Sequence, residues 1–217
     1  MLALYGHPFS SYTWKALIAL YANDTPFEFR MVNGEHPEHA AFVASASPLG
    51  KFPVLVEGAR TVFEATAIIE YLHLHHPGPA PLLPVDPDAA VEVRMIDRVF
   101  DISVMDSMQE IVAEYIRSPD RPDPTVGDRV RDRLDRAYRW IDSWLKREPR
   151  GGDAITLVEC AAAPSLFYAD WVYQIPPSYP HLRQWRAHLL ALPAVKRCVD
   201  DARPYRQYFP LGAPDRD

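Results

Sequence analysis

A proline-rich segment at residues 78–84 divides the chain into two parts with different sequence patterns. Its sequence, Gly-Pro-Ala-Pro-Leu-Leu-Pro, cannot continue a helix, and its prolines favour an extended backbone. We therefore interpret residues 78–88 as a linker that joins a first domain, residues 1–77, to a second domain, residues 89–217.

The first part alternates between strand and helix patterns. Strands are predicted at residues 2–5 and 27–32, on either side of a helix at 11–23 whose apolar positions recur every three or four residues. Two further strand patterns, at 54–56 and 61–63, flank a short turn and predict a β-hairpin, and a helix from Glu64 to His76 stops before Pro77. The order βαβ-ββα predicts a small mixed four-stranded sheet with helices packed on it.

The second part has helical patterns throughout. Helices are predicted at residues 86–117 and 126–146, and Pro180 and Pro193 mark two further helix starts. Thr156 and Glu159 have the spacing of a capping box at the start of a helix. In this motif the Thr side chain accepts a backbone N–H of the first helical turn, and the Glu side chain accepts the backbone N–H of the Thr. The predicted fold class is therefore α+β with two domains, the second an all-α helix bundle.

Composition and charge exclude several classes of partner. The net charge is −6, and 23 Lys and Arg residues are scattered among 29 Asp and Glu without a basic stripe, so no nucleic-acid partner is expected. No apolar run approaches the roughly 18 residues that a membrane helix needs, which predicts a soluble cytoplasmic protein.

Cysteines and clustered histidines do not predict a metal site. Cys160 and Cys198 lack CxxC or Cys/His spacing and are interpreted as buried free thiols. His73, His75 and His76 lie at the end of a predicted helix, where the helix dipole and solvent explain them more simply than a metal ion does.

Two stretches in the first part look suited to binding a small ligand. Residues 48–55, Pro-Leu-Gly-Lys-Phe-Pro-Val-Leu, place a Phe-Pro step before a strand, and residues 63–72 place an acidic residue at the start of a helix. A step of this kind can expose backbone groups, and a helix N-terminus attracts negative charge. We therefore expect a single ligand to contact both.

The chain as a whole resembles the cytosolic glutathione transferase family. The resemblance is carried by residues 10–20, 34–36, 48–55, 63–72 and 155–159, in family order and spacing, and it covers nearly the whole chain. It implies a thioredoxin-like, glutathione-binding first domain and a helical second domain. It also implies a homodimer that acts in detoxification, with glutathione as co-substrate and a small electrophilic molecule, largely apolar, as its other substrate.

The start of the first helix looks most like the serine-type classes, zeta and theta-like. By that resemblance Ser11 or Ser10 is the catalytic hydroxyl that holds glutathione as a thiolate, although serine is also a preferred helix cap. The thiol needs such help because its pKa of about 8.5 leaves it mostly protonated at neutral pH. Tyr5 sits where tyrosine-type classes keep their hydroxyl, and Tyr12 falls where some relatives have a cysteine, which disfavours disulfide chemistry here.

The resemblance also implies a set of glutathione-binding residues around the Phe-Pro step. Pro53 is expected to be a cis-proline that turns the backbone of Phe52 outward, so that it pairs with the peptide part of glutathione. His36 and Lys51 match positions that reach the glycyl carboxylate.

At the start of the third helix the sequence departs from the family pattern. Glu64 is expected to meet the γ-glutamyl ammonium, and the N–H of residue 65 its carboxylate. The family pair is Glu-Ser, whereas this chain has Ala65, so one hydroxyl is missing. Thr66 is a possible substitute, although it lies about 100° further around the helix.

The electrophile pocket is expected on the helix at 86–117, with Phe100, Met105, Met108 and Tyr115 as candidates. Two alternatives to a transferase remain open at this stage. One is a zeta-like isomerase, suggested by the Ser10-Ser11 pair, and the other is a non-catalytic protein that uses the same fold for binding or scaffolding, suggested by Ala65.

Overall fold

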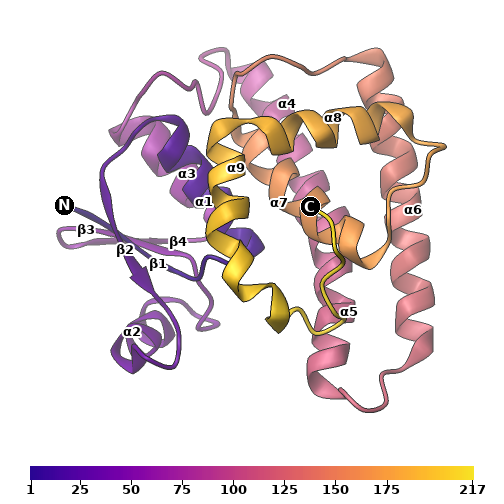
Figure 1. Ribbon diagram of the computed structural model, residues 1–217. Coiled ribbons are helices and arrows are strands. Elements are labelled where there is room, and N and C mark those ends of the chain that lie inside the picture. The colour runs from indigo at the N-terminus through magenta and orange to yellow at the C-terminus, as the bar shows by residue number, and fades with distance from the viewer.

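A computed structural model describes residues 1–217 (Figure 1). The first part contains β1 (Leu2–Gly6), α1 (Ser11–Ala22), β2 (Phe27–Met31), α2 (Pro37–Ala46), β3 (Val54–Glu57), β4 (Arg60–Phe63) and α3 (Ala65–His75). The strands form one sheet in the order β2-β1-β3-β4. β1 pairs with β2 in parallel and with β3 antiparallel, and β3 and β4 form the hairpin. The predicted mixed four-stranded sheet is thus confirmed.

Helices cover both faces of this sheet. α1 and α3 pack together on the side that faces the second part of the chain, whereas α2 lies apart on the other side (Figure 1). Val43 of α2 packs with Ala3, Tyr5 and Val54 of the sheet in a small separate core. The sequence did not predict α2, because Val43 is its only buried residue and a single apolar position gives no helical stripe.

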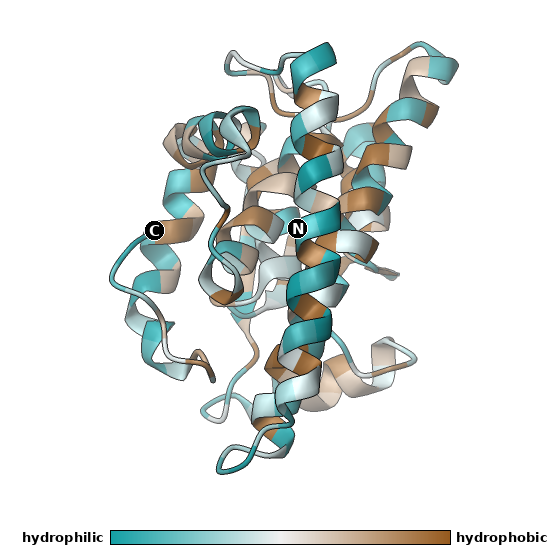
Figure 2. Ribbon diagram, turned by 90° about the vertical axis from the view of Figure 1, so that its right-hand side faces the viewer, coloured by the Kyte–Doolittle hydropathy of each residue, from teal (hydrophilic) through white to brown (hydrophobic).

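The second part is almost entirely helical. Its elements are α4 (Pro87–Arg98), a π-helical stretch (Val99–Met105), α5 (Asp106–Arg117), α6 (Pro124–Arg147), α7 (Leu157–Val172), α8 (Pro180–Ala191), α9 (Pro193–Ala202) and a short 3₁₀ helix (Arg203–Tyr208). The helical run predicted over 86–117 is confirmed, with the π-helical stretch at its centre. α6 begins two residues earlier than expected, because Asp123 caps it and Pro124 fits its first turn. Figure 2 faces α6 and shows hydrophilic and hydrophobic residues alternating along it.

The predicted capping box starts the central helix α7. The N–H of Val158 donates to Thr156 Oγ1 at 3.2 Å, and the N–H of Thr156 donates to Glu159 Oε2 at 2.9 Å. Nearly every residue of α7 is buried, so these bonds satisfy backbone groups that water cannot reach.

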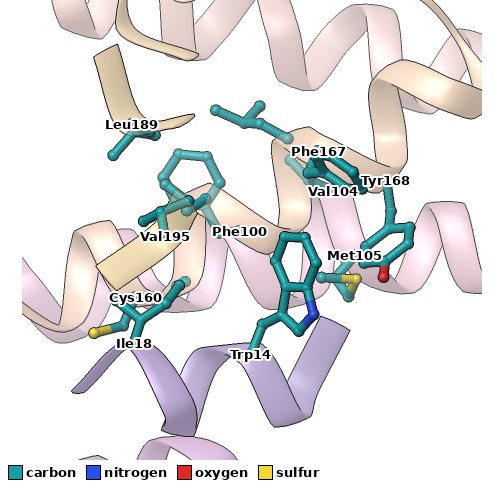
Figure 3. Close-up of a cluster of buried hydrophobic side chains, with 14 of the residues drawn as sticks. Trp14, Ile18, Phe100, Val104, Met105, Cys160, Phe167, Tyr168, Leu189 and Val195 are labelled. Carbon is teal, nitrogen blue, oxygen red and sulfur yellow. The ribbon is translucent and has the colours of Figure 1, made fainter. Parts of the chain in front are cut away.

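One hydrophobic core of 52 buried residues joins the two parts. Trp14 and Ile18 of α1 point into it alongside Phe100, Phe167 and Val195 from the helical part (Figure 3). α1 is therefore packed against the sheet on one side and against the helical bundle on the other. No helix in the structure has both the length and the apolar character required to cross a lipid bilayer.

The segment at residues 78–84 is packed against both parts of the chain. The N–H of Ala80 donates to Asn23 Oδ1 at the end of α1, at 2.7 Å, and Leu82 O accepts the N–H of Leu157 at 2.8 Å. Gly78 lies so close to Asn23 that a Cβ at this position would come within 2.6 Å of its side chain.

Candidate functional site

The two serines at the start of α1 have different environments. Ser10 is the N-cap, and its Oγ accepts the N–H of Thr13 at 3.2 Å. Ser11 is the first residue of the helix, with 3% of its surface exposed, and its Oγ lies 3.4 Å from Nε2 of Gln109 on α5. Because an amide nitrogen can only donate, the hydroxyl proton of Ser11 is free to be donated elsewhere.

Ser11 lies on the wall of a cavity of about 280 Å³ between the two parts of the chain. The cavity is lined by the loop before α1 and the first residue of that helix, by Phe52, by one face of α5, by α7, and by the end of the 3₁₀ helix with the two residues after it. The lining residues are Phe9, Ser10, Ser11, Phe52, Met108, Gln109, Val112, Ile116, Tyr168, Tyr208, Phe209 and Pro210. None of them is charged, so the cavity combines a mostly apolar wall with a few hydroxyl and amide groups.

Two of the lining aromatic side chains are fixed by contacts to each other. Tyr168 OH donates to the carbonyl oxygen of Phe9 at 2.9 Å, and the two rings meet edge to face at 5.5 Å. Burial raises the pKa of Tyr168 well above its ordinary value, so this hydroxyl stays protonated. It is a structural donor and is not available to a ligand thiol.

Phe52 and Pro53 lie beside this cavity, immediately before β3. The peptide bond between them is cis, as the resemblance implied. Pro53 is buried, whereas Phe52 is half-buried and lines the cavity. Phe52 therefore borders the same cavity as Ser11.

Glu64 and Ala65 form the start of α3. Glu64 has φ 68° and ψ 119°, a backbone conformation that a residue with a side chain adopts rarely and that recurs at functional sites. Its carboxylate is exposed and makes no ion pair. Ala65 is buried at the first helical position, where the free N–H groups of the first turn can accept an anion.

Thr66 points away from this helix start into a buried polar network. Its Oγ1 accepts from Lys15 Nζ at 2.8 Å and from Arg98 Nη2 at 2.7 Å, and it donates to Asp97 Oδ2 at 3.0 Å. Lys15 also lies 2.5 Å from Asp97 and 2.8 Å from Asp101. Burial raises the pKa of Asp101, and the charge of Lys15 opposes that shift. Thr66 therefore does not supply the hydroxyl that Ala65 lacks.

The structure does not bring His36 or Lys51 to the cavity wall. His36 is exposed at the start of α2, with its Nδ1 3.3 Å from Glu38 Oε1. Lys51 is exposed, and its N–H donates to Ser47 Oγ at 3.3 Å. Lys51 makes no ion pair, whereas His36 lies beside the carboxylate of Glu38.

Of the four candidates for the electrophile pocket, only Met108 lines the cavity. Phe100 and Met105 are completely buried in the shared core, and Tyr115 packs against that core from a half-buried position. The cavity wall on α5 is instead the stripe Met108, Val112 and Ile116, whose four-residue spacing was visible in the sequence. No spacing pattern in the sequence indicated that Gln109 or residues 208–210 would line the cavity.

The two tyrosines near the serines have other partners. Tyr5 OH bonds to Arg30, and its ring stacks on Phe42 at the α2 face of the sheet, on the opposite side from the shared core. Tyr12 OH donates to Asp106 Oδ1 at 3.0 Å. Burial, and then the charges of Asp101 and Asp106, raise the pKa of Tyr12, so it stays protonated.

Comparison with known proteins gives matches along nearly the whole chain. Residues 4–80 match the family model for the glutathione S-transferase N-terminal domain, and residues 124–188 match the model for the C-terminal domain. A probable maleylacetoacetate isomerase of Caenorhabditis elegans is 34% identical over 204 residues, which cover 93% of this chain and 94% of that protein.

Solved structures agree with this match. A glutathione S-transferase of Methylobacillus flagellatus with bound glutathione has a TM-score of 0.78 at 26% identity, covering 91% of this chain and 98% of that one. A maleylacetoacetate isomerase of Anaeromyxobacter dehalogenans, with dicarboxyethyl glutathione and citrate in its active site, has a TM-score of 0.72 at 25% identity. That alignment covers 99% of this chain and 93% of the other.

Proposed function

The chain belongs to the glutathione S-transferase family, and on this premise we propose that it transfers glutathione to a small, neutral, largely apolar electrophile. The observation that carries the proposal is the position of Ser11. Its hydroxyl lies at the N-terminus of α1, on the wall of an uncharged cavity, with its oxygen held by Gln109 and its proton free.

In this proposal glutathione lies along the Phe-Pro step. Its peptide part pairs with the backbone of Phe52, a residue that lines the cavity together with Ser11. Glu64, with its unpaired carboxylate, receives the γ-glutamyl ammonium, and the N–H groups at Ala65 receive the adjacent carboxylate. His36 and Lys51, which lie outside the cavity wall, receive the glycyl carboxylate at the other end of glutathione in this proposal.

The chemical step needs glutathione as a thiolate. Ser11 donates its free proton in a hydrogen bond to the sulfur, and the positive end of α1 adds to this stabilisation, so the thiol pKa falls. The thiolate sulfur then attacks an electrophilic carbon held in the cavity. A carbon–sulfur bond forms, and the leaving group departs with the electron pair of the bond that breaks.

A zeta-like isomerase is the second candidate. It is favoured by the Ser10-Ser11 pair and by the maleylacetoacetate isomerases among the relatives. Maleylacetoacetate carries two carboxylates, and a site that binds a dianion in an apolar cavity needs cationic partners for it. No Lys, Arg or His lines the cavity here, which supports a neutral electrophile instead.

A homodimer that acts in the cytoplasm in detoxification is part of the same proposal. The dimer is supported by a row of exposed apolar side chains along one face of the α4 region. Val91, Met95 and Ile102 are 62%, 55% and 54% exposed, which is unusual for a helix packed in a monomer. Sedimentation analysis should give twice the 24.7 kDa chain mass, and Ile102→Asp should lower it. A monomeric wild type would contradict this part.

Calorimetric titration with glutathione and a conjugation assay with chlorodinitrobenzene test the main proposal. Ser11→Ala should lower kcat/KM roughly 10- to 150-fold, the value of one charge-assisted hydrogen bond. Ser10→Ala is the matched control, because it removes a helix cap while leaving Ser11 in place. Absence of binding at millimolar glutathione would contradict the proposal and favour a non-catalytic protein. Activity on maleylacetoacetate alone would favour the isomerase.

A further inference from the structure

A second group of polar side chains lies at the start of α2, outside the cavity. His36, Glu38 and His39 each place one possible ligand atom within 4.8 Å of the others. α2 stands apart from the helical part of the chain (Figure 1), so this group is accessible from solvent. The histidines at the end of α3 form no such group.

The separations within the group suit a tetrahedral ion. His36 Nδ1 lies 3.3 Å from Glu38 Oε1, and His39 Nε2 lies 3.7 Å from the same oxygen. Zinc bonds of about 2.0–2.1 Å to nitrogen and oxygen put tetrahedral ligand atoms about 3.3 Å apart. Two of the three distances between ligand atoms therefore need to change little when a zinc ion binds.

The backbone around His39 fixes which nitrogen can bind an ion. His39 Nδ1 lies 2.7 Å from the carbonyl oxygen of Met31 at the end of β2. Because a carbonyl oxygen only accepts, Nδ1 carries a hydrogen, and Nε2, which lies towards Glu38, is the ring nitrogen that can bind an ion. A second ring nitrogen held in this way is the usual support of a metal-binding histidine.

The loop that carries His36 is held as well. Asn33 Oδ1 accepts the N–H groups of Glu35 at 3.1 Å and of His36 at 3.2 Å. Pro37 then begins α2, so that His36 is its N-cap and His39 lies in its first turn, with the two imidazole rings 4.9 Å apart. The three ligand side chains are thus arranged before any ion binds.

We propose that His36, Glu38 and His39 form a zinc-binding site on α2 with its fourth position open to solvent. Two imidazoles and a carboxylate are a donor set that zinc accepts readily. The site shares His36 with the proposed glycyl end of the glutathione site, but zinc binding does not rest on the transferase activity. Titrations omit glutathione, because its thiol binds zinc itself.

The test uses the 217-residue chain without an affinity tag, stripped of metal and titrated with zinc in competition with a chromophoric chelator. We expect one zinc ion per chain. Glu38→Gln and His39→Gln should each weaken zinc binding roughly 10-fold or more. Replacing a residue that only hydrogen-bonds to a metal ligand already lowers metal affinity by about that factor, and these two residues are ligands themselves. Glu35→Gln is the matched control, because it removes a charge from the same loop without removing a ligand.

Cobalt provides a second readout. Co²⁺ bound by these three residues and one water should give the intense visible absorption of a tetrahedral ion, and that absorption should disappear in His39→Gln. Circular dichroism verifies that the variants are folded. Zinc affinity unchanged in His39→Gln, or lowered as much by Glu35→Gln as by Glu38→Gln, would overturn the proposal.

Discussion

The side-chain amide of Gln109 lies 3.4 Å from the hydroxyl oxygen of Ser11, the first residue of α1. The amide comes from α5 in the helical part, and the hydroxyl comes from the sheet part. Each domain thus supplies one member of the pair, and the direction of the serine proton depends on how the two domains pack.

Removing this amide should slow conjugation without abolishing it. In Gln109→Ala the hydroxyl of Ser11 can rotate away from the thiol, and the loss of one neutral hydrogen bond corresponds to roughly a 2- to 12-fold lower kcat/KM. The pH–rate profile should shift to higher pH, since the bound thiol becomes less acidic. Val112→Ala also enlarges the cavity and is the control. Superimposable profiles for Gln109→Ala and wild type would refute the assignment.

Ala65→Ser should tighten glutathione binding. Ala65 is buried at the first position of α3, where a hydroxyl can bond the γ-glutamyl carboxylate in our proposal. The expected gain is roughly 10- to 150-fold in Kd, measured by calorimetry. Ala67→Ser, on the exposed side of the same turn, should change nothing. Equal or weaker binding in Ala65→Ser would mean that the carboxylate lies elsewhere.

His7 should make the protein less stable in acid. Its Nδ1 accepts the N–H of Phe9 at 3.1 Å, and burial lowers its pKa below the ordinary 6.5. The unfolded chain therefore binds a proton that the folded chain does not, and the free energy of unfolding falls as the pH drops below 6.5. Urea unfolding between neutral and mildly acid pH should show a smaller fall in His7→Asn. His75→Asn, at an exposed position, should behave like wild type.

Lys15 should be far more important for folding than its charge alone suggests. The residue is 1% exposed and lies between Asp97 and Asp101, so Lys15→Met leaves two buried carboxylates with Arg98 as their one remaining cationic partner. Breaking a buried ion pair from one side costs about 3–5 kcal/mol of unfolding free energy. Lys196→Met removes an exposed pair on α9 and should have little effect on urea unfolding. Similar midpoints for both variants would contradict this prediction.

Elements with strong periodic patterns were predictable from the sequence. The four strands, α1, α3 and the long helices follow from apolar spacing and from caps such as Thr156. α2 was missed because burial of Val43 alone leaves no stripe to detect. The π-helical stretch at 99–105 was also invisible, since one wider turn changes the apolar spacing too little within a long helix.

The candidate site was only partly predictable. The N-cap preference applies equally to Ser10 and Ser11, and only the hydrogen bond to Thr13 shows which of them is the cap. Phe100 and Met108 share the same helical pattern, yet the first lies in the core and the second on the cavity. Gln109 was missed because its partner is 98 residues away in sequence.

The buried network around Lys15 also limits how such proteins can be recombined. Lys15 belongs to the sheet part, whereas Asp97 and Asp101 belong to the helical part, and neither side is charge-balanced without the other. A chimaera that takes residues 1–77 from a relative without a cation at position 15 would leave two buried acids with Arg98 as their one cation. Lobe exchange between relatives should therefore succeed only when these three positions are transferred together.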